Sequence, residues 1–282
     1  MMPPDFDRLP WDGPDRLDFD GIAVEFCVPP ALYERESTNE RFVLGKSPAM
    51  LRSLLREIGP RVPRHIVDIG VYKGGSVVLL NELFRPEALL ALEISPLDVP
   101  PLTHYLGARG EGRLLWARGI DQADRPTVHV ACDRAFGDAP IDLVVDDASH
   151  WYAQTLASFT AIFPRMAPGG LYAIEDWAWA HWPDPHWQQD FGGPHFSRQP
   201  PLSNLLVDLM LLAAGAPSAF ERVAFDASTI YVTRGPGALP RDFAPSSMMH
   251  NRAQPIPRFA PSVGAPTPVY ESARFVISSG KR

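Results

Sequence analysis

The sequence has few cysteines, no excess of basic residues and no long apolar run. Its 282 residues include two cysteines, Cys27 and Cys132, which exclude a disulfide scaffold and do not read as a metal-binding pair. Lys and Arg total 26 against 33 for Asp and Glu, a net charge of −7, whereas binding to a phosphate backbone needs clustered cations. No apolar run approaches the roughly 18 to 20 residues that span a bilayer.

A signal peptide is not expected either. The start, MMPPDFDRLPWDGPD, is acidic and proline-rich, whereas a signal peptide has a basic and then an apolar region. Hydrophobic residues make up 45% of the chain and charged residues 21%, which suffices for a large core. We expect a globular, cytoplasmic protein whose partner is a small molecule rather than a nucleic acid or a membrane. The sequence leaves open whether it forms a homo-oligomer.

Proline, by contrast, is abundant and gathers in two flanks. Of 31 prolines, six lie in the first 30 residues and eight between Gly235 and Arg282. Proline removes a backbone donor and fixes φ, so we expect extended or loop structure in both flanks. The chain then divides into an N-terminal segment (1–45) that acts as a lid, one folded domain (46–235) and a C-terminal extension (236–282).

Between the flanks, apolar runs alternate with helical patterns. Near-continuous apolar runs are typical of parallel strands buried on both faces. The expected strands are His65–Val71, Ala88–Ile94, Arg113–Ala117, Ile141–Asp146 and Leu171–Asp176, followed by a hairpin of Glu221–Phe225 and Thr229–Thr233. The expected helices are Ser47–Ile58, Ser76–Phe84, Pro126–Phe136, Trp151–Met166 (stopped by Pro168-Gly169-Gly170) and Leu202–Ala214. This order predicts an α/β fold with a doubly wound, Rossmann-like, mostly parallel seven-stranded sheet and a terminal antiparallel hairpin.

A glycine turn follows the first strand and opens a helix. It reads Asp68-Ile-Gly70-Val-Tyr72-Lys-Gly74-Gly75-Ser76. Glycines let the backbone approach a ligand, and the helix N-terminus offers free N–H groups. Tyr72 replaces the second glycine of dinucleotide-binding turns, and Asp68 suits a cationic amino-acid group, so the motif favours S-adenosylmethionine over NAD. The alternative is a turn kept only for strand-to-helix packing.

Three further positions extend this cofactor site. Glu93 ends the next strand, 23 residues after Gly70, where a carboxylate can accept hydrogen bonds from ribose hydroxyls. Asp121 and Gln122 follow the third strand, where a side-chain oxygen can bind an adenine amine. Asp121 can instead simply cap a helix.

Acidic residues end the fourth and fifth strands. The fourth ends in Asp146-Asp147-Ala-Ser-His150 and the fifth in Glu175-Asp176. Neighbouring parallel strands lie about 5 Å apart, so Asp147, Glu175 and Asp176 converge. Crowded carboxylates repel unless a cation lies among them, and oxygen ligands suit Mg²⁺ first, then Mn²⁺ or Ca²⁺. These three residues are therefore the predicted metal ligands.

His150 is the predicted general base. It stands three residues after Asp147 at the expected start of a helix, where the positive dipole end lowers its pKa and favours the neutral form. Asp146 is expected to support the cofactor side of the site. The alternatives are that either aspartate caps the helix and that His150 is a surface residue of its first turn.

Four segments together resemble a known family. They are DIGVYKGGS (68–76), LEIS (92–95), DDASH (146–150) and FPRMAPGGLYAIEDW (163–177). The sequence is similar here to class I S-adenosylmethionine-dependent methyltransferases, and more narrowly to the metal-dependent macrocin and mycinamicin sugar O-methyltransferases and the cephalosporin hydroxylase-like group. The resemblance spans roughly residues 60 to 235 and does not extend to the proline-rich flanks.

This resemblance implies a role for each predicted site residue. It makes Asp147, Glu175 and Asp176 ligands of Mg²⁺, and His150 the base that acts beside Asp147. It places Asp68 and Gly70 at the amino-acid part of S-adenosylmethionine and Glu93 at its ribose. The implied reaction is methyl transfer to a hydroxyl of a sugar or polyketide natural product, as in antibiotic tailoring.

The segment after Trp177 matches no pattern of that family, so the sequence does not name the acceptor. Tryptophans around the fourth and fifth strand ends suggest an aromatic wall for a large, partly apolar acceptor: Trp151, Trp177, Trp179, Trp182 and Trp187. Two alternatives to an O-methyltransferase remain: a hydroxylase-like protein of the same fold, and a non-catalytic cofactor-binding scaffold.

Overall fold

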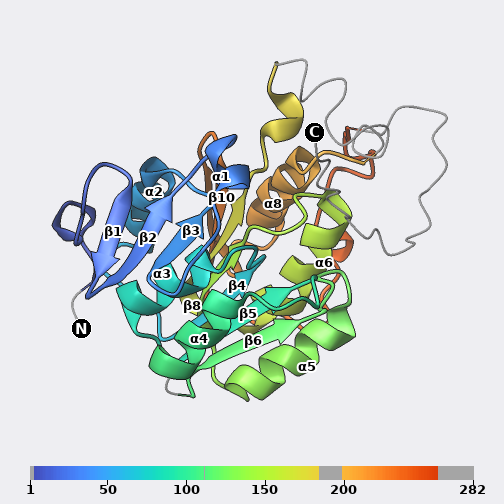
Figure 1. The fold of residues 1–282 in the computed structure, drawn as a ribbon. Helices are drawn as coiled ribbons and strands as arrows, with labels where there is room; N and C mark the ends of the chain where they lie inside the picture. Colours follow the sequence, from blue (N-terminus) through green and yellow to red (C-terminus); the bar gives the residue numbers. More distant parts are fainter. Residues whose placement is uncertain (1–2, 111, 184–198, 260–282) are drawn as a thin grey trace.

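The computed structural model describes residues 3–110, 112–183 and 199–259, which fold around one large sheet (Figure 1). Within these residues its seven strands are β4 (His65–Ile69), β5 (Ala88–Glu93), β6 (Leu114–Arg118), β7 (Ile141–Asp146), β8 (Met166–Glu175), β9 (Phe220–Phe225) and β10 (Thr229–Arg234). Their order is β6-β5-β4-β7-β8-β10-β9, with β4 to β8 parallel and β10 antiparallel to both neighbours. The expected Rossmann-like sheet with a terminal hairpin is confirmed.

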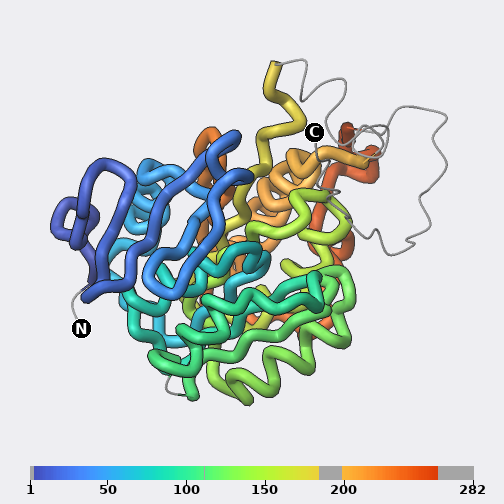
Figure 2. Tube along the Cα trace, viewed as in Figure 1, coloured from blue at the N-terminus to red at the C-terminus, as the bar shows by residue number. Residues whose placement is uncertain are grey.

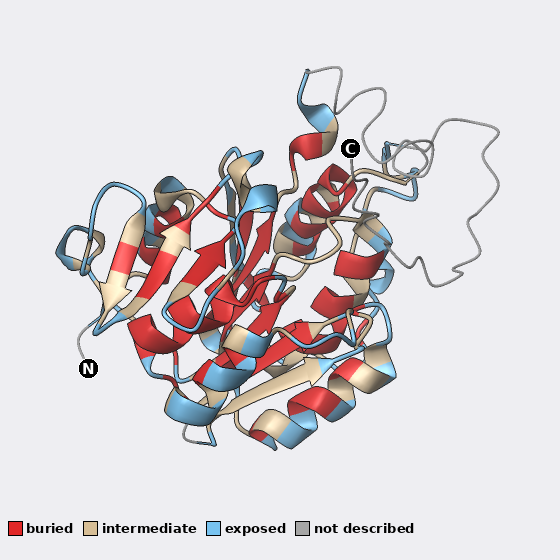
Figure 3. Ribbon diagram, viewed as in Figure 1, coloured by how far each residue is buried: buried red, intermediate tan, exposed pale blue. Residues whose placement is uncertain are grey.

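Helices cover both faces of this main sheet. One face carries α2 (Pro48–Ile58), α3 (Gly75–Phe84) and α4 (Pro100–Arg109); the other carries α5 (Arg125–Phe136), α6 (Tyr152–Ile162) and α8 (Ser203–Gly215). Alternate residues of a strand enter opposite cores: Ile66 joins the first, and Val67 and Ile69 join the second. Burial on both faces explains the near-continuous apolar runs, and Figure 3 shows the central strands as buried.

Two expectations about helices were wrong. The helix predicted to reach Met166 ends at Ile162, because Phe163–Arg165 tighten into a 3₁₀ turn around Pro164. The Pro168-Gly169-Gly170 breaker therefore lies inside β8. Helix α4 was missed, because the sequence analysis names no element there. Two prolines open this helix, and a helix tolerates proline at that position, since its first N–H groups have no partner within the helix.

The N-terminal flank is more ordered than its prolines suggest. Within the described residues, β1 (Arg16–Phe19), β2 (Ile22–Phe26) and β3 (Arg41–Leu44) form a small sheet, with β2 antiparallel to β1 and parallel to β3. We call it the N-terminal sheet. Its inner face joins the core of α2 and α3 through Val24, Phe42 and Leu44, all almost completely buried. The flank is thus part of the fold, where the sequence predicts loop or extended chain.

The C-terminal flank also contributes to the core. Phe243 is 2% exposed and packs against Phe159 and Phe220. Farther on, Phe259 exchanges two hydrogen bonds with the Asn204 side chain of α8 (2.8 and 2.9 Å). Figure 2 shows this stretch beside α8, on the opposite side of the main sheet from the N-terminal sheet. No helix among the described residues is long and apolar enough to cross a membrane.

The junction between the N-terminal sheet and α3 allows a direct test. A Cβ added at Gly75 would lie 2.4 Å from the carbonyl oxygen of Val43 in β3, so Gly75→Ala must push the two elements apart. We expect it to lower the free energy of unfolding by about 2 kcal/mol in a urea titration. Gly107→Ala in α4, where an added Cβ meets nothing within 4 Å, is the matched control and should be neutral or stabilising. Equal stabilities of the two variants would contradict this packing.

Candidate functional site

The predicted site residues lie where the carboxyl ends of β4, β5, β7 and β8 meet at one edge of the main sheet. The Asp147 amide donates to the Ile69 carbonyl at 2.9 Å, tying the loop after β7 to the end of β4. Gly70 has φ +94°, and an added Cβ there would lie 2.1 Å from the Asp147 carbonyl oxygen. Only glycine fits, and the glycine turn and the acidic loop are therefore in direct contact.

Asp68 supplies an unsatisfied buried oxygen beneath this turn. Its Oδ2 accepts from the Ser76 hydroxyl at 2.6 Å, whereas its Oδ1 is buried without a hydrogen-bond partner among the described residues. Burial raises the pKa of Asp68 to about 7, although the Ser76 hydrogen bond opposes the rise. A buried carboxylate oxygen is costly until a donor reaches it. An ammonium group of a ligand is such a donor.

Glu93 shapes the glycine turn from the neighbouring strand. Its Oε2 accepts from the amides of Val71 (2.9 Å) and Tyr72 (3.0 Å), and its Oε1 accepts from the amide of Ser95 (2.8 Å). Carboxylate oxygens have further lone pairs, so Glu93 can still accept from a ligand hydroxyl. The sequence does not reveal this second task of holding the turn.

Gln122 and Asp146 meet in a buried network. Gln122 donates to Asp146 (3.2 Å) and accepts from the Ser149 amide (3.1 Å), while Ser158 and Tyr172 donate to Asp146 at 2.7 and 2.9 Å. Burial raises the pKa of Asp146 to about 6, although these hydrogen bonds lower it. The network fixes the base of the acidic loop, and a contact of either residue with a cofactor stays a prediction.

Asp121 does not cap a helix, because the N-cap of α5 is Asp124; its side chain closes a turn in the loop after β6. Its Oδ1 accepts from the amide of Ala123 at 2.8 Å. Its contact with an adenine amine remains a prediction.

The acidic loop and the end of β8 bring together a group with metal-binding geometry. Asp147, His150 and Asp176 each offer one ligand atom, and these atoms lie within 4.8 Å of one another. His150 Nε2 lies 3.0 Å from Asp147 Oδ1. Two carboxylates and an imidazole suit a divalent cation such as Mg²⁺ or Mn²⁺. Asp147 and Asp176 thus converge as predicted.

Glu175 has a different neighbour, which sequence reasoning missed. Lys46 Nζ donates to Glu175 and, at 2.6 Å, to Asp147 Oδ2, so a positive side chain lies between two predicted metal ligands. Lys46 is 7% exposed. It lies between β3 and α2, 101 positions before Asp147, and no local pattern connects the two. We refer to Asp147, His150, Glu175 and Asp176 as the acidic cluster.

The charges of the acidic cluster shift its pKa values in opposite directions. Burial by itself raises the pKa of Asp147, but Lys46 and His150 outweigh it and hold that pKa below its usual range. At Glu175 burial outweighs Lys46, and the pKa is raised. Nearby positive charge therefore favours the ionised form of Asp147, whereas at Glu175 it does not offset burial.

The predicted environment of His150 needs correction. The residue precedes α6, which begins at Tyr152 with Trp151 as its N-cap, so it is not in the first helical turn. Burial lowers the pKa of His150, yet the hydrogen bond and charge of Asp147 outweigh this and raise it. The carboxylates, and not the helix dipole, dominate its electrostatics.

Three site residues adopt left-handed backbone conformations that are uncommon outside glycine. They are Tyr72 (φ +48°), His150 (φ +56°) and Asp176 (φ +52°). Such conformations are costly and gather at functional sites. Tyr72 is 52% exposed on the glycine turn, and Gly74 (φ +86°) caps α3 behind it.

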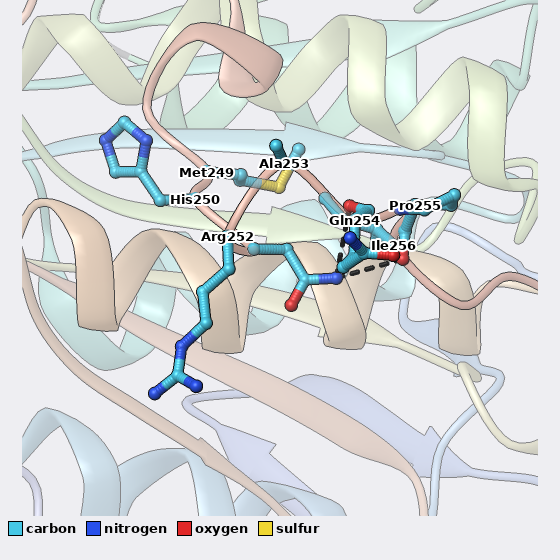
Figure 4. Close-up of a pocket in the computed structure, with 8 residues that line it drawn as sticks. Met249, His250, Arg252, Ala253, Gln254, Pro255 and Ile256 are labelled. Atoms are coloured by element: carbon cyan, nitrogen blue, oxygen red, sulfur yellow. Dashed lines mark hydrogen bonds between the residues drawn. The ribbon is translucent and has the colours of Figure 1, made fainter.

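The aromatic residues near the site are only partly described. Trp177 donates to the Asp226 carbonyl at 2.9 Å, Trp179 is buried and Trp182 is 37% exposed. Trp187 lies outside the described residues. A hollow of about 630 Å³ is lined by residues 249–256 of the C-terminal stretch (Figure 4), and none of these belongs to the glycine turn or the acidic cluster.

The site region coincides with a known domain. Residues 67–177 match a family model described as a methyltransferase domain. A tetracenomycin 2'-O-methyltransferase from Streptomyces olivaceus, which acts on the 8-demethyl-8-alpha-L-rhamnosyl compound, is 40% identical over 126 residues, covering 36% of this chain and 32% of that protein. The mycinamicin VI 2''-O-methyltransferase of Micromonospora griseorubida is 36% identical over 121 residues, covering 42% and 27%.

The chain thus spans about a third of the length of these curated relatives. Among solved structures, the MycE methyltransferase of the mycinamycin biosynthetic pathway, in complex with Mg and SAH, has the same fold. It aligns with a TM-score of 0.50 at 24% identity, over 73% of this chain and 54% of that one.

The unpaired carboxylate of Asp68 leads to a stability test. Its native pKa of about 7 lies above the usual value of about 3.9, so between these values the folded chain holds a proton that the unfolded chain lacks. Stability is therefore lost as pH rises through this window. We expect Asp68→Asn to raise the melting temperature of the ligand-free protein by about 2 to 5 °C at pH 8, and by less at pH 5.

Asp138→Asn, at an exposed position, is the control and should melt like wild type at both pH values. The same Asp68→Asn protein should bind SAH at least about tenfold more weakly by calorimetry, because the acceptor for the ligand ammonium is gone. Lower stability at pH 8 together with unchanged SAH affinity would contradict this account of Asp68.

Proposed function

Because the chain carries a class I S-adenosylmethionine-dependent methyltransferase domain related to the macrocin and mycinamicin sugar O-methyltransferases, we propose that it methylates a hydroxyl of a natural-product acceptor. One observation carries the proposal: the glycine turn touches the acidic loop at Gly70 and Asp147. A methyl donor bound at the first would lie beside an acceptor held at the second. Methyl transfer is an in-line displacement that depends on such proximity.

The residues of the turn fit S-adenosylmethionine. The unsatisfied Oδ1 of Asp68 suits the ammonium of its amino-acid part, and Glu93 suits the ribose hydroxyls. Gly70 and Gly74 keep the backbone open for close approach of the ligand. The cofactor, when bound, supplies a methyl group on a sulfonium centre.

The acidic cluster fits a hard divalent cation such as Mg²⁺. Asp147 and Asp176 would hold it, with Glu175 completing the predicted oxygen set. Such an ion lowers the pKa of a coordinated hydroxyl and orients it.

His150 is the proposed general base. With Nε2 donating to Asp147 Oδ1, Nδ1 is the ring atom that accepts the acceptor's proton as the new C–O bond forms. The buried bond to Asp147 fixes the orientation and tautomer of the ring, and the network of Asp146, Gln122 and Tyr172 holds the loop that carries both residues.

The acceptor is proposed to be a glycosylated polyketide. The relatives in tetracenomycin and mycinamicin chemistry are named for 2'-O- and 2''-O-methylation, and Trp182 is an exposed tryptophan on the segment that follows β8. In this proposal residues 46–235 carry the reaction, while residues 1–45 and 236–282 cover the acceptor side. A contact between the glycine turn and the N-terminal segment supports the role proposed for residues 1–45, because Lys73 Nζ donates to the Leu32 carbonyl at 3.0 Å.

The experiment uses labelled S-adenosylmethionine and a panel of glycosylated polyketides with a free sugar hydroxyl. We expect a labelled methyl ether in the presence of Mg²⁺ and at least about a hundredfold less product after EDTA treatment, with recovery on adding Mg²⁺ back. Undiminished turnover in EDTA would contradict a role for the metal. Absence of a labelled product with every acceptor would contradict the proposed reaction.

Asparagine variants separate the base from the metal ligands. Asparagine tolerates the left-handed backbone at both positions, so His150→Asn and Asp176→Asn change chemistry without adding backbone strain. We expect His150→Asn to lower kcat by about 10² to 10⁴-fold and to change Mn²⁺ affinity by less than about threefold. Asp176→Asn should weaken Mn²⁺ binding at least about tenfold, measured by calorimetry. Comparable losses of Mn²⁺ affinity in both variants would make His150 a ligand rather than the base.

A further inference from the structure

The Lys46 ammonium has a setting that the proposed reaction does not use. Its Nζ is enclosed and donates to two carboxylates, Asp147 and Glu175. A small cavity of about 20 Å³ beside it is lined mainly by apolar side chains of α2 and α3, including Met50, Leu51 and Leu79. Glu175 supplies the carboxylate among the described residues that line this cavity, so Asp147 and Glu175 are the charged partners of the ammonium.

A divalent cation at the acidic cluster would share carboxylates with Lys46. Asp147 gives Oδ2 to Lys46 and faces His150 with Oδ1, and Glu175 gives Oε2 to Lys46. A hard cation takes carboxylate oxygens at about 2.0 to 2.6 Å. An ammonium and a divalent ion on the same oxygens would lie within a few ångströms of each other, in a buried place where like charges repel strongly.

We propose that Lys46 and the divalent cation exclude each other at Asp147 and Glu175, so that cation loading displaces the Lys46 ammonium. This inference rests on the proposed function, since it presupposes a cation at the acidic cluster. Lys46 then acts as an internal counter-ion that holds Asp147 and Glu175 in place before the cation arrives. It also lowers the apparent cation affinity, because each binding event must break two ion pairs.

The displacement reaches the N-terminal segment. Lys46 lies between β3 and Ser47, the N-cap of α2. Moving Lys46 away from the carboxylates therefore shifts the chain that joins the N-terminal sheet to the domain. The same segment is held to the glycine turn through Ser37, whose hydroxyl donates to the Lys73 carbonyl at 2.7 Å. Cation and cofactor sites therefore share one stretch of chain, residues 37–46.

Mn²⁺ titration calorimetry on the full chain tests the exclusion. Lys46→Met keeps the length of the side chain but not its charge, and we expect it to bind Mn²⁺ at least about tenfold more tightly than wild type. Lys73→Met is the matched control: it removes a second buried lysine that holds the N-terminal segment but does not contact the acidic cluster, and its Mn²⁺ affinity should stay within about twofold of wild type.

The outcomes separate this inference from the proposed function. Equal or weaker Mn²⁺ binding by Lys46→Met, with wild type binding normally, overturns the exclusion and leaves the methyltransferase proposal standing. Absence of Mn²⁺ binding in both proteins overturns the exclusion and the metal role together. Binding by Lys46→Met alone supports the exclusion in its strongest form.

Lysine labelling of the wild-type protein decides the matter if Lys46→Met does not fold. The sequence holds only three lysines, Lys46, Lys73 and Lys281, so acetylation at each is readily resolved by mass spectrometry. Saturating Mn²⁺ should raise acetylation of Lys46 at least about threefold and leave Lys73 unchanged, because a side chain released from two carboxylates loses its proton more readily and the neutral amine is the form that is acetylated. Unchanged labelling of Lys46 would show that ammonium and cation coexist, and would overturn the exclusion.

Discussion

The need to neutralise buried carboxylates at one edge of the main sheet governs the organisation of this protein. The carboxyl groups come from adjacent strand ends and belong to Asp147, Glu175 and Asp176. Burial alone would raise the pKa of each and favour its protonated form. Lys46 opposes this with its positive charge, and His150 opposes it at Asp147 with a hydrogen bond. Because Lys46 stands in the short connection between β3 and α2, the charge balance of the site links the N-terminal sheet to the domain. A reaction that needs a cation at the acidic cluster therefore depends on the contact of Lys46 with Asp147 and Glu175.

Glycine provides the geometry in which this charge can act. Gly70 lets the turn after β4 touch the Asp147 backbone, and Gly75 lets α3 approach Val43 of the N-terminal sheet. The turn is thereby clamped between the acidic loop and the flank, with Glu93 holding its amides from the side. The glycine turn, the acidic cluster and the N-terminal sheet pack against one another, so a movement of one displaces the others.

The flanks differ in how they join this unit. The N-terminal sheet enters the core of α2 and α3, whereas the C-terminal stretch inserts Phe243 among Phe159 and Phe220 on the other face. The matches with these curated relatives cover 36% and 42% of this chain and about a third of the relatives' own length. The chemistry of the shared part is accordingly the better-supported portion of the proposed function, and the flanks are where acceptor choice would differ.

The sequence by itself determined the layered fold and the edge at which the site lies. Strands buried on both faces leave continuous apolar runs, and polar residues at their ends, from Asp68 to Asp176, must meet at one edge of a parallel sheet. The sequence did not determine where Lys46 lies or that His150 precedes α6. Nor did it show that the Gln122 side chain is hydrogen-bonded to Asp146 and Ser149. Those depend on contacts between residues up to 129 positions apart and on the local backbone of a loop, which no periodicity records. Only the folded chain brings a lysine from the connection between β3 and α2 to the carboxylates of Asp147 and Glu175.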